Sequence, residues 1–197
     1  MQSFERLLQG RYLFHIHTTY TDGHASVDDY AELAQVSGLG GLAFTEHVRR
    51  KLDYDFDEFV AEINEARKKY PDLNIVLGIE AKIMLGGGID APLNAFMQAD
   101  IIGIATHSFD GTQEKLEQAW RTQFSMGTKS RAIIWMHPEP RLFHLMSEAV
   151  DAGFYIENNL TYKDLPRHIP ENQIVHGVNA HSVIDAHIGL IELEIIQ

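Results

Sequence analysis

Short apolar segments alternate with amphipathic segments along the whole of this chain of 197 residues. The apolar segments are rich in Ile, Val, Leu and Phe, which is typical of strands buried on both faces. The pattern predicts seven such strands, at residues 12–17, 41–45, 74–80, 100–106, 132–136, 154–159 and 173–181. Helical periodicity predicts the other elements, at residues 1–10, 26–37, 57–70, 112–125 and 140–152 and from Ser182 onward.

Capping and turn residues mark where these elements begin and end. Ser26 can cap a helix N terminus, and Asp29 three residues later completes a variant of the capping box. Pro71 ends the helix that starts at Asp57, because proline cannot continue the hydrogen bonding of a helix. The glycines within residues 85–88 predict a loop or hairpin, since their spacing matches no phosphate-binding loop.

The alternation of strand and helix predicts an α/β fold with a parallel sheet. About seven such units in so short a chain favour a compact, irregular barrel, with an open doubly wound sheet as the alternative. We find no internal repeat and no linker, so we expect a single domain over residues 1–197. In a barrel the C-terminal ends of the strands meet at one face, where active sites lie.

Composition narrows the chemistry that is possible. The chain has no cysteine, so any bound metal must be held by His, Asp and Glu. No apolar run approaches the roughly 20 residues that span a bilayer, which argues against a membrane protein. The first residues lack the order of a signal peptide, so we expect a cytoplasmic protein. A net charge of −12 argues against a nucleic-acid partner.

Potential metal ligands recur at the C-terminal ends of the predicted strands. His15 and His17 are separated by one residue, so they should lie on the same face of a strand. Alone this pair is a weak signal, because ordinary neighbours can also satisfy two histidines. Further predicted strands end in the same kind of residue, namely His47, Glu80, His107, His137 and His181. Asp22, in a Thr-Asp-Gly turn after the first strand, can add an oxygen ligand.

Together these eight side chains offer more ligands than the four or so that one zinc ion takes. We therefore expect two or three divalent metal ions, with the Glu80 carboxylate as the natural bridge between them. The His and carboxylate donors suit zinc, manganese or iron. Such a centre makes a nucleophile from water at neutral pH and binds the reacting oxygens, so it is suited to hydrolysis.

The order and spacing of the motifs resemble the PHP (polymerase and histidinol phosphatase) domain family over nearly the whole chain. The matching segments are His15-Ile16-His17, Thr21-Asp22-Gly23, Thr45-Glu46-His47, Gly78-Ile79-Glu80, Thr106-His107, Met136-His137-Pro138, Ile156-Glu157-Asn158-Asn159 and Gly177-Val178-Asn179-Ala180-His181-Ser182. The resemblance implies a distorted (β/α)7 barrel with a trinuclear metal centre, and usually phosphoesterase activity.

The resemblance also implies how the ligands are shared among the metals. His15 and His17 would hold the first, His107 and His137 the second, and Asp22, His47 and His181 the third, with Glu80 as a bridge between the first two. His24, in the same loop as Asp22, is an alternative or additional ligand. We expect Glu80 and His181 to take part directly in catalysis.

One position departs from the pattern of the family. Its last motif normally reads Gly-Ser-Asp-Ala-His, and the Asp binds the first metal, whereas this chain has Asn179. A neutral amide oxygen binds a dication more weakly than a carboxylate does. A literal Asp-Ala-His occurs later, at residues 185–187, but Asp185 falls within the last predicted helix, so we assign the motif to Asn179 and His181.

The leading functional hypothesis is a metal-dependent phosphoesterase that hydrolyses a small phosphomonoester or phosphodiester with a metal-activated water. Arg49, Lys82 and Asn159 are candidate substrate-binding residues, and Asn159 is alternatively a support for a metal ligand. One alternative is a metal-binding or regulatory module with weakened catalysis, which Asn179 favours. Another is a nuclease like the PHP domains of bacterial DNA polymerases. The sequence does not indicate the substrate or the oligomeric state.

Overall fold

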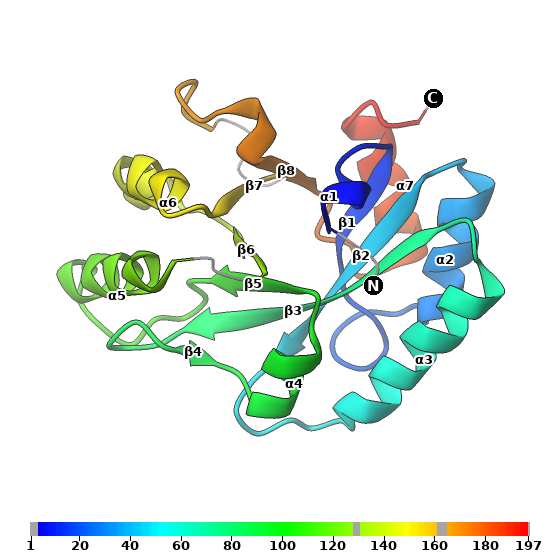
Figure 1. The fold of residues 1–197 in the computed structure, drawn as a ribbon, viewed down its shortest axis with the longest axis horizontal. Helices are drawn as coiled ribbons and strands as arrows, with labels where there is room; N and C mark the ends of the chain where they lie inside the picture. Colours follow the sequence, from blue (N-terminus) through cyan, green and yellow to red (C-terminus); the bar gives the residue numbers. More distant parts are fainter. Residues whose placement is uncertain (1–3, 128–130, 161–164, 197) are drawn as a thin grey trace.

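The computed structural model describes residues 4–127, 131–160 and 165–196. Within these residues, seven parallel strands are paired in the order β1-β2-β3-β5-β6-β7-β8 and form a nearly closed barrel (Figure 1). Their bounds are β1 Tyr12–Ile16, β2 Gly41–Val48, β3 Asn74–Ile83, β5 Ile101–Ala105, β6 Ala132–Trp135, β7 Tyr155–Asn159 and β8 Ile174–Gly177. The expected distorted (β/α)7 barrel is thus confirmed.

Backbone hydrogen bonds join the segment after β8 to β1 and thereby close the barrel. The Val178 N–H donates to Phe14 O at 3.0 Å, and the Ala180 N–H donates to His15 O at 2.9 Å. The His17 N–H returns a bond of 2.9 Å to Ala180 O. An open doubly wound sheet would leave β1 and β8 apart, so these contacts exclude that alternative.

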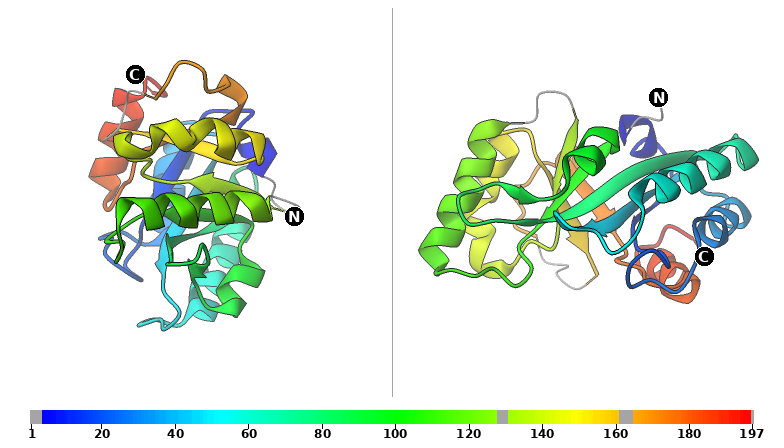
Figure 2. Two further views of the ribbon diagram at one scale, coloured as in Figure 1. Left: turned by 90° about the vertical axis from the view of Figure 1, so that its left-hand side faces the viewer. Right: turned by 90° about the horizontal axis from the view of Figure 1, so that it is seen from below.

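Helices cover the outside of the barrel in two groups (Figures 1 and 2). On one side lie α2 (Val27–Val36), α3 (Phe56–Lys69) and α7 (Val183–Glu192), and on the other lie α5 (Gln113–Met126) and α6 (Met146–Asp151). The capping box expected at the start of α2 is present, because Ser26 and Asp29 exchange side chain to backbone hydrogen bonds. No helix in the described ranges is long and apolar enough to cross a membrane.

The short helix α1 (Phe4–Leu7) packs at the N-terminal end of the barrel. Phe4 makes an edge-to-face contact with Tyr155, the first residue of β7, at 4.9 Å between ring centroids. Leu7 sits so close to Gly41, the first residue of β2, that a Cβ there would meet it at 2.9 Å. Both helix residues join the apolar cluster that fills the barrel interior. This end of the barrel is therefore closed by packing, which leaves the opposite end for chemistry.

The structure differs from the predicted elements at several places. Strand β3 continues to Ile83 and pairs antiparallel with β4 (Ile89–Asp90), which gives the hairpin expected around residues 85–88. The helix α4 (Leu93–Gln98) that follows was not predicted. The helix predicted at residues 140–152 is a 3-10 helix, η1 (Pro140–Leu145), that continues into α6. A further 3-10 turn, η2 (Glu171–Gln173), precedes β8. Tertiary contacts decide such short elements more than local periodicity does.

Candidate metal centre

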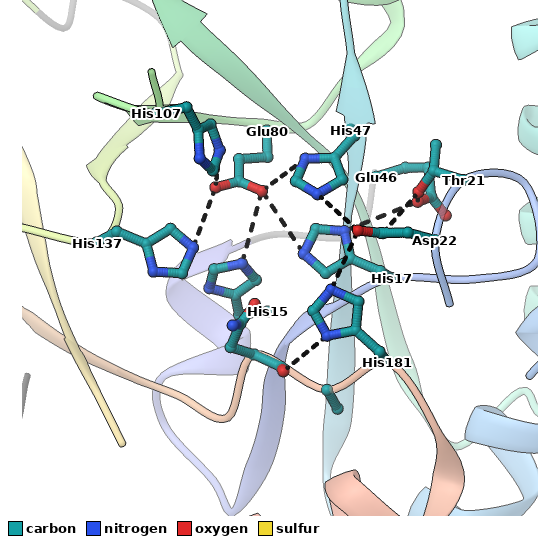
Figure 3. Close-up of polar contacts among 12 residues, drawn as sticks. His15, His17, Thr21, Asp22, Glu46, His47, Glu80, His107, His137 and His181 are labelled. Carbon is teal, nitrogen blue, oxygen red and sulfur yellow. Dashed lines mark hydrogen bonds and ion pairs between the residues drawn. The ribbon is translucent and has the colours of Figure 1, made fainter. Parts of the chain in front are cut away.

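The carboxylate of Glu80 lies at the centre of a group of imidazole rings at the C-terminal end of the barrel (Figure 3). The side chain is fully buried. Its Oε1 atom lies 2.9 Å from Nε2 of His107 and 3.3 Å from Nε2 of His137. These two histidines follow β5 and β6, so neighbouring strands bring them to the same oxygen.

The second oxygen of Glu80 faces a different set of histidines. Oε2 lies 3.7 Å from Nε2 of His15 and 3.5 Å from Nε2 of His17, both on the first strand or directly after it. Oε2 is also 2.9 Å from Nδ1 of His47, which pairs with Glu80 in the β2–β3 register. The two oxygens of one carboxylate thus address two groups of ligands, which is the geometry of a bridge between two ions.

A third group of ligands surrounds Asp22. Its Oδ2 atom lies 3.5 Å from Nε2 of His47 and 3.4 Å from Nε2 of His181. Asp22 is brought back over the strand end by a turn in which Gly23 donates its N–H to Thr18 O. A Cβ at Gly23 would lie 2.2 Å from the carbonyl oxygen of His17, so only glycine allows this turn. The alternative ligand His24 is exposed to solvent.

These residues fit divalent metal ions in both donor chemistry and spacing. Several of their atoms are buried without a hydrogen bond, namely His15 Nε2, both ring nitrogens of His17, His47 Nδ1 and Glu80 Oε2. Buried polar atoms rarely stay without a partner, and bound cations would give partners to all of these except Nδ1 of His17, which faces Glu46 at 3.8 Å. Two ligands of one zinc ion lie about 3.3 Å apart when each bond is about 2.0 Å. Most of the separations above are close to that value.

Four groups of at least three His or carboxylate side chains have ligand atoms close enough to share one ion. They are His15, His17 and Glu80; His47, Glu80 and His107; His17, His47 and His181; and His15, His137 and Glu157. The groups overlap, so they form one continuous cluster rather than separate sites. Of the predicted histidine and carboxylate ligands, all except Asp22 appear in these groups.

Glu157 of β7 is a buried carboxylate for which the sequence suggested no role. It makes a short hydrogen bond with Nδ1 of His15. Its other oxygen accepts the backbone N–H of His137 at 2.8 Å and the Asn159 amide at 3.2 Å. A carboxylate on Nδ1 fixes the ring orientation and directs Nε2 toward the metal position. An acidic residue directly after the apolar run 154–156, within a predicted strand, was the signal that could have identified it.

Glu46, next to the ligand His47, is a second buried carboxylate that sequence reasoning missed. It accepts hydrogen bonds from the Thr18 N–H at 2.9 Å, from the Thr18 hydroxyl at 2.5 Å and from the Thr21 hydroxyl. One of its oxygens also lies 3.8 Å from Nδ1 of His17. Glu46 therefore holds the loop that carries Asp22 and lies behind the ring of His17.

The charges of the cluster shift the pKa values of its members in opposite directions. Burial alone would raise the pKa of Glu80, but the surrounding imidazoles, His107 first, hold it well below its ordinary value. Burial alone would lower the pKa of His15, but Glu157 and Glu80 outweigh this effect and raise it to about 10. For His17 burial dominates and lowers the pKa to about 4. Glu80 is thus an anion, ready to bind cations.

Backbone conformation at the ligands is unusual. Five described non-glycine residues have positive φ, and four of them are predicted ligands: His15 (69°), His107 (34°), His137 (47°) and Asn179 (51°). This left-handed region costs energy for residues with a Cβ, and such strain gathers at functional sites. At His15 the β1–β2 register also shifts. The simple alternation expected for His15 and His17 therefore does not hold, although both rings reach Glu80.

The predicted substrate-binding residues and the two candidates for the last motif lie in different surroundings. Asn159 is buried, and its Nδ2 lies 2.9 Å from Nδ1 of His137, so its surroundings suit the ligand-supporting role rather than substrate contact. Lys82 Nζ donates to Ser108 O at 2.5 Å in the loop after β5. Arg49 lines a cavity beside His47. Asn179 O lies 3.2 Å from Nδ1 of His181, and Asp185 is exposed in the first turn of α7.

Metal binding should release protons above neutral pH. In the metal-free protein the raised pKa of His15, about 10, keeps its ring protonated at about pH 8. A metal on Nε2 must displace that proton, so the apparent affinity should rise about tenfold per pH unit up to about pH 10. Calorimetric titration in buffers of different ionisation enthalpy should detect at least one proton per metal-loaded chain at about pH 8.

Glu157→Gln is the control for that measurement. It removes the carboxylate that does most to raise the pKa of His15, so fewer protons should be released at about pH 8. Zero proton release by the parent protein would show that His15 is neutral before the metal binds.

Comparison with known proteins identifies the family of this chain. A search of curated proteins finds no match. Among solved structures the chain is similar to a two-domain protein from Bacteroides vulgatus that contains a predicted PHP-like metal-dependent phosphoesterase, with 14% identity and a TM-score of 0.44. The match covers 88% of this chain and 52% of the other, so this chain spans about half the length of that protein. The model of the PHP domain matches residues 14–191, and the chain therefore belongs to the PHP domain family.

Proposed function

We propose that this protein is a metal-dependent phosphoesterase that hydrolyses a small phosphomonoester or phosphodiester at a centre of two or three divalent ions. The observation that carries the proposal is the buried Glu80 carboxylate, whose two oxygens face two different groups of histidines. The PHP domain match supports the hydrolase class.

In this proposal the protein's own residues hold the charges in place. His15 and His17 would hold one ion, and His107 and His137 a second, with Glu80 between them. Asp22, His47 and His181 would hold a third. When bound, such ions supply Lewis acidity toward the phosphate oxygens and lower the pKa of a coordinated water. Glu157 and Glu46 would fix the orientation of His15 and His17 from behind, so the ligands need little rearrangement.

His181 is the ligand placed best for a direct role in the reaction. Its ring is about one third exposed, whereas His15 and His17 are fully buried. Its Nδ1 lies 3.2 Å from Asn179 O, and a ring that donates there turns Nε2 toward Asp22 and the open side of the cluster. We propose that His181 contacts the substrate side of the third metal position.

The second candidate function is a metal-binding module with weakened catalysis. Asn179 favours it, because a neutral amide stands where the family has a ligand carboxylate. Both candidates predict metal binding, and only the first predicts turnover. They are therefore separated by measuring metal content and activity on the same preparation.

Elemental analysis after purification in excess manganese or zinc should find two or three metals per chain. The same protein should hydrolyse p-nitrophenyl phosphate or bis(p-nitrophenyl) phosphate, and chelation should abolish the activity. At most one metal per chain would contradict the multinuclear centre.

The matched variants for this test are two histidine replacements. His107→Ala removes a predicted metal ligand that contacts Glu80 Oε1. His144→Ala removes an exposed ring outside the cluster, which pairs with Glu117 at 3.5 Å. Only the first should lower metal content and activity. Full metal content without turnover on a broad panel of phosphate esters would favour the binding module.

A further inference from the structure

A cavity of about 370 Å³ opens beside the third group of ligands. Asp22 and His47 form part of its wall, so it adjoins the ligand cluster directly. The rest of the wall comes from the loop between β2 and α3 and from the first loop of the chain: Tyr20, Thr21, Arg49, Lys51, Leu52, Asp53 and Tyr54. Its size lies in the range of small-molecule sites, roughly 300–1,000 Å³.

Two cations in this wall lack an acidic partner in the described part of the chain. Neither Arg49 nor Lys51 has a carboxylate within 4.0 Å among the residues that the structure describes. Arg49 is held in place because its Nη1 donates to Val48 O at 2.6 Å. Of the two acids in the wall, Asp22 belongs to the ligand cluster and Asp53 is exposed. In a protein of net charge −12, these two residues place positive charge beside the ligand cluster.

Another part of the wall is formed by aromatic rings that pack on one another. The rings of Tyr20 and Tyr54 lie 5.6 Å apart, and Tyr20 also packs against Phe59 at 5.3 Å. The Tyr54 hydroxyl donates to His47 O at 3.0 Å, which ties this wall to the strand that carries the ligand. Leu52 is half-buried between the charged and aromatic residues of the loop. The cavity therefore offers a metal end, an apolar body and a positively charged side.

We propose that this cavity is the subsite for the part of the substrate beyond the scissile phosphate, and that it selects phosphate esters carrying a second anionic group. The inference rests on the proposed function, because it assumes that the phosphate binds at the metal cluster. Arg49 and Lys51 would bind the second anion, for which the planar arginine fork is well shaped. Tyr20, Leu52 and Tyr54 would pack against the apolar body between the two anionic ends.

Matched aryl phosphates test the proposal. Phenyl phosphate, 4-carbamoylphenyl phosphate and 4-carboxyphenyl phosphate differ only in the second group, and 1,4-phenylene bisphosphate replaces the carboxylate with phosphate. The metal-loaded protein should prefer a second anion over the carboxamide by about tenfold in kcat/KM, the usual effect of a charge-assisted hydrogen bond. Comparison of kcat/KM for the carboxylate and the bisphosphate shows which second anion the cavity prefers.

The preference ratio in variants identifies the residues responsible. Arg49→Gln and Lys51→Gln should each reduce the ratio of carboxylate to carboxamide kcat/KM, and the double variant should bring it close to one. Arg50→Gln removes the same charge from an exposed neighbour outside the cavity wall, so its ratio should match that of the parent. A parent enzyme with equal activity on carboxylate and carboxamide overturns the inference and leaves the phosphoesterase function intact.

Binding measurements keep this test separate from the proposed function. If the protein hydrolyses none of the esters, the phosphoesterase proposal fails, but the subsite is still measurable. Calorimetry with 4-carboxybenzylphosphonate and 4-carbamoylbenzylphosphonate, which cannot be hydrolysed, compares the same two groups on the metal-loaded protein. About tenfold tighter binding of the carboxylate, lost in the double variant, supports the subsite, and equal affinity overturns it.

Discussion

Glu80→Gln should remove more than one metal equivalent and lower activity by about a thousandfold or more. The variant keeps the size of the side chain but offers one carbonyl oxygen and one amide NH₂. Whichever way the amide turns, one of the two groups of histidines meets N–H donors in place of a lone pair. Because the carboxylate is fully buried and faces both groups, the loss should affect two ions together.

Glu157→Gln is the matched control for the effect of removing a buried carboxylate. Its side chain is as buried as that of Glu80, but it contacts His15 and His137 from behind. It should weaken metal affinity by about 10- to 100-fold, yet saturate with the same number of metals as the parent. The metal content of both variants at saturation shows whether the carboxylate bridges two ions. Circular dichroism shows whether either variant is unfolded. Full occupancy and turnover in Glu80→Gln would show that Glu80 is not the bridge.

The fold was predictable because its strands are short, apolar and regularly spaced. The pattern located all seven parallel strands, since burial on both faces leaves few polar residues within them. It missed α4, whose sequence is too short to carry a period, and it located the hairpin of β3 and β4 only through its glycines. It also predicted a continuous helix after Pro140, where the chain first forms a 3-10 turn.

The ligands were predictable for a related reason, whereas their supports were not. A histidine at the end of an apolar strand is visible in the sequence, and the barrel brings such strand ends together. The contacts of Glu46 and Glu157 depend on which residues lie behind the ligand rings, and no spacing rule gives that. The partner of Lys82, the Ser108 carbonyl in the loop after β5, is likewise set by the folded loop and not by spacing. The contribution of Arg49 depends on a cavity that only the folded loop creates.

Asn179→Asp should strengthen metal binding at the His15 and His17 position by about 10- to 100-fold, because a ligand carboxylate adds charge that an amide lacks. The segment that contains Asn179 is hydrogen-bonded along β1, with Ala180 paired to both His15 and His17. Its φ of 51° is left-handed, a conformation that Asn and Asp both tolerate, so the substitution should add little strain. Asn179→Asp therefore changes the charge of the side chain while its size and backbone conformation stay nearly the same.

The competing possibility is that Asp185 supplies the missing carboxylate. It is exposed, and its N–H donates to Ser182 Oγ at 3.1 Å as part of the helix cap, so Asp185→Asn should leave metal binding unchanged. Metal titration of the parent and both variants, read by calorimetry and by activity at limiting metal, decides between them. The Asn179→Asp gain in activity should shrink as metal saturates, because a filled site no longer benefits from tighter binding. If only Asp185→Asn changes occupancy, then Asn179 does not lie at the weak metal position and the motif belongs to residues 185–187.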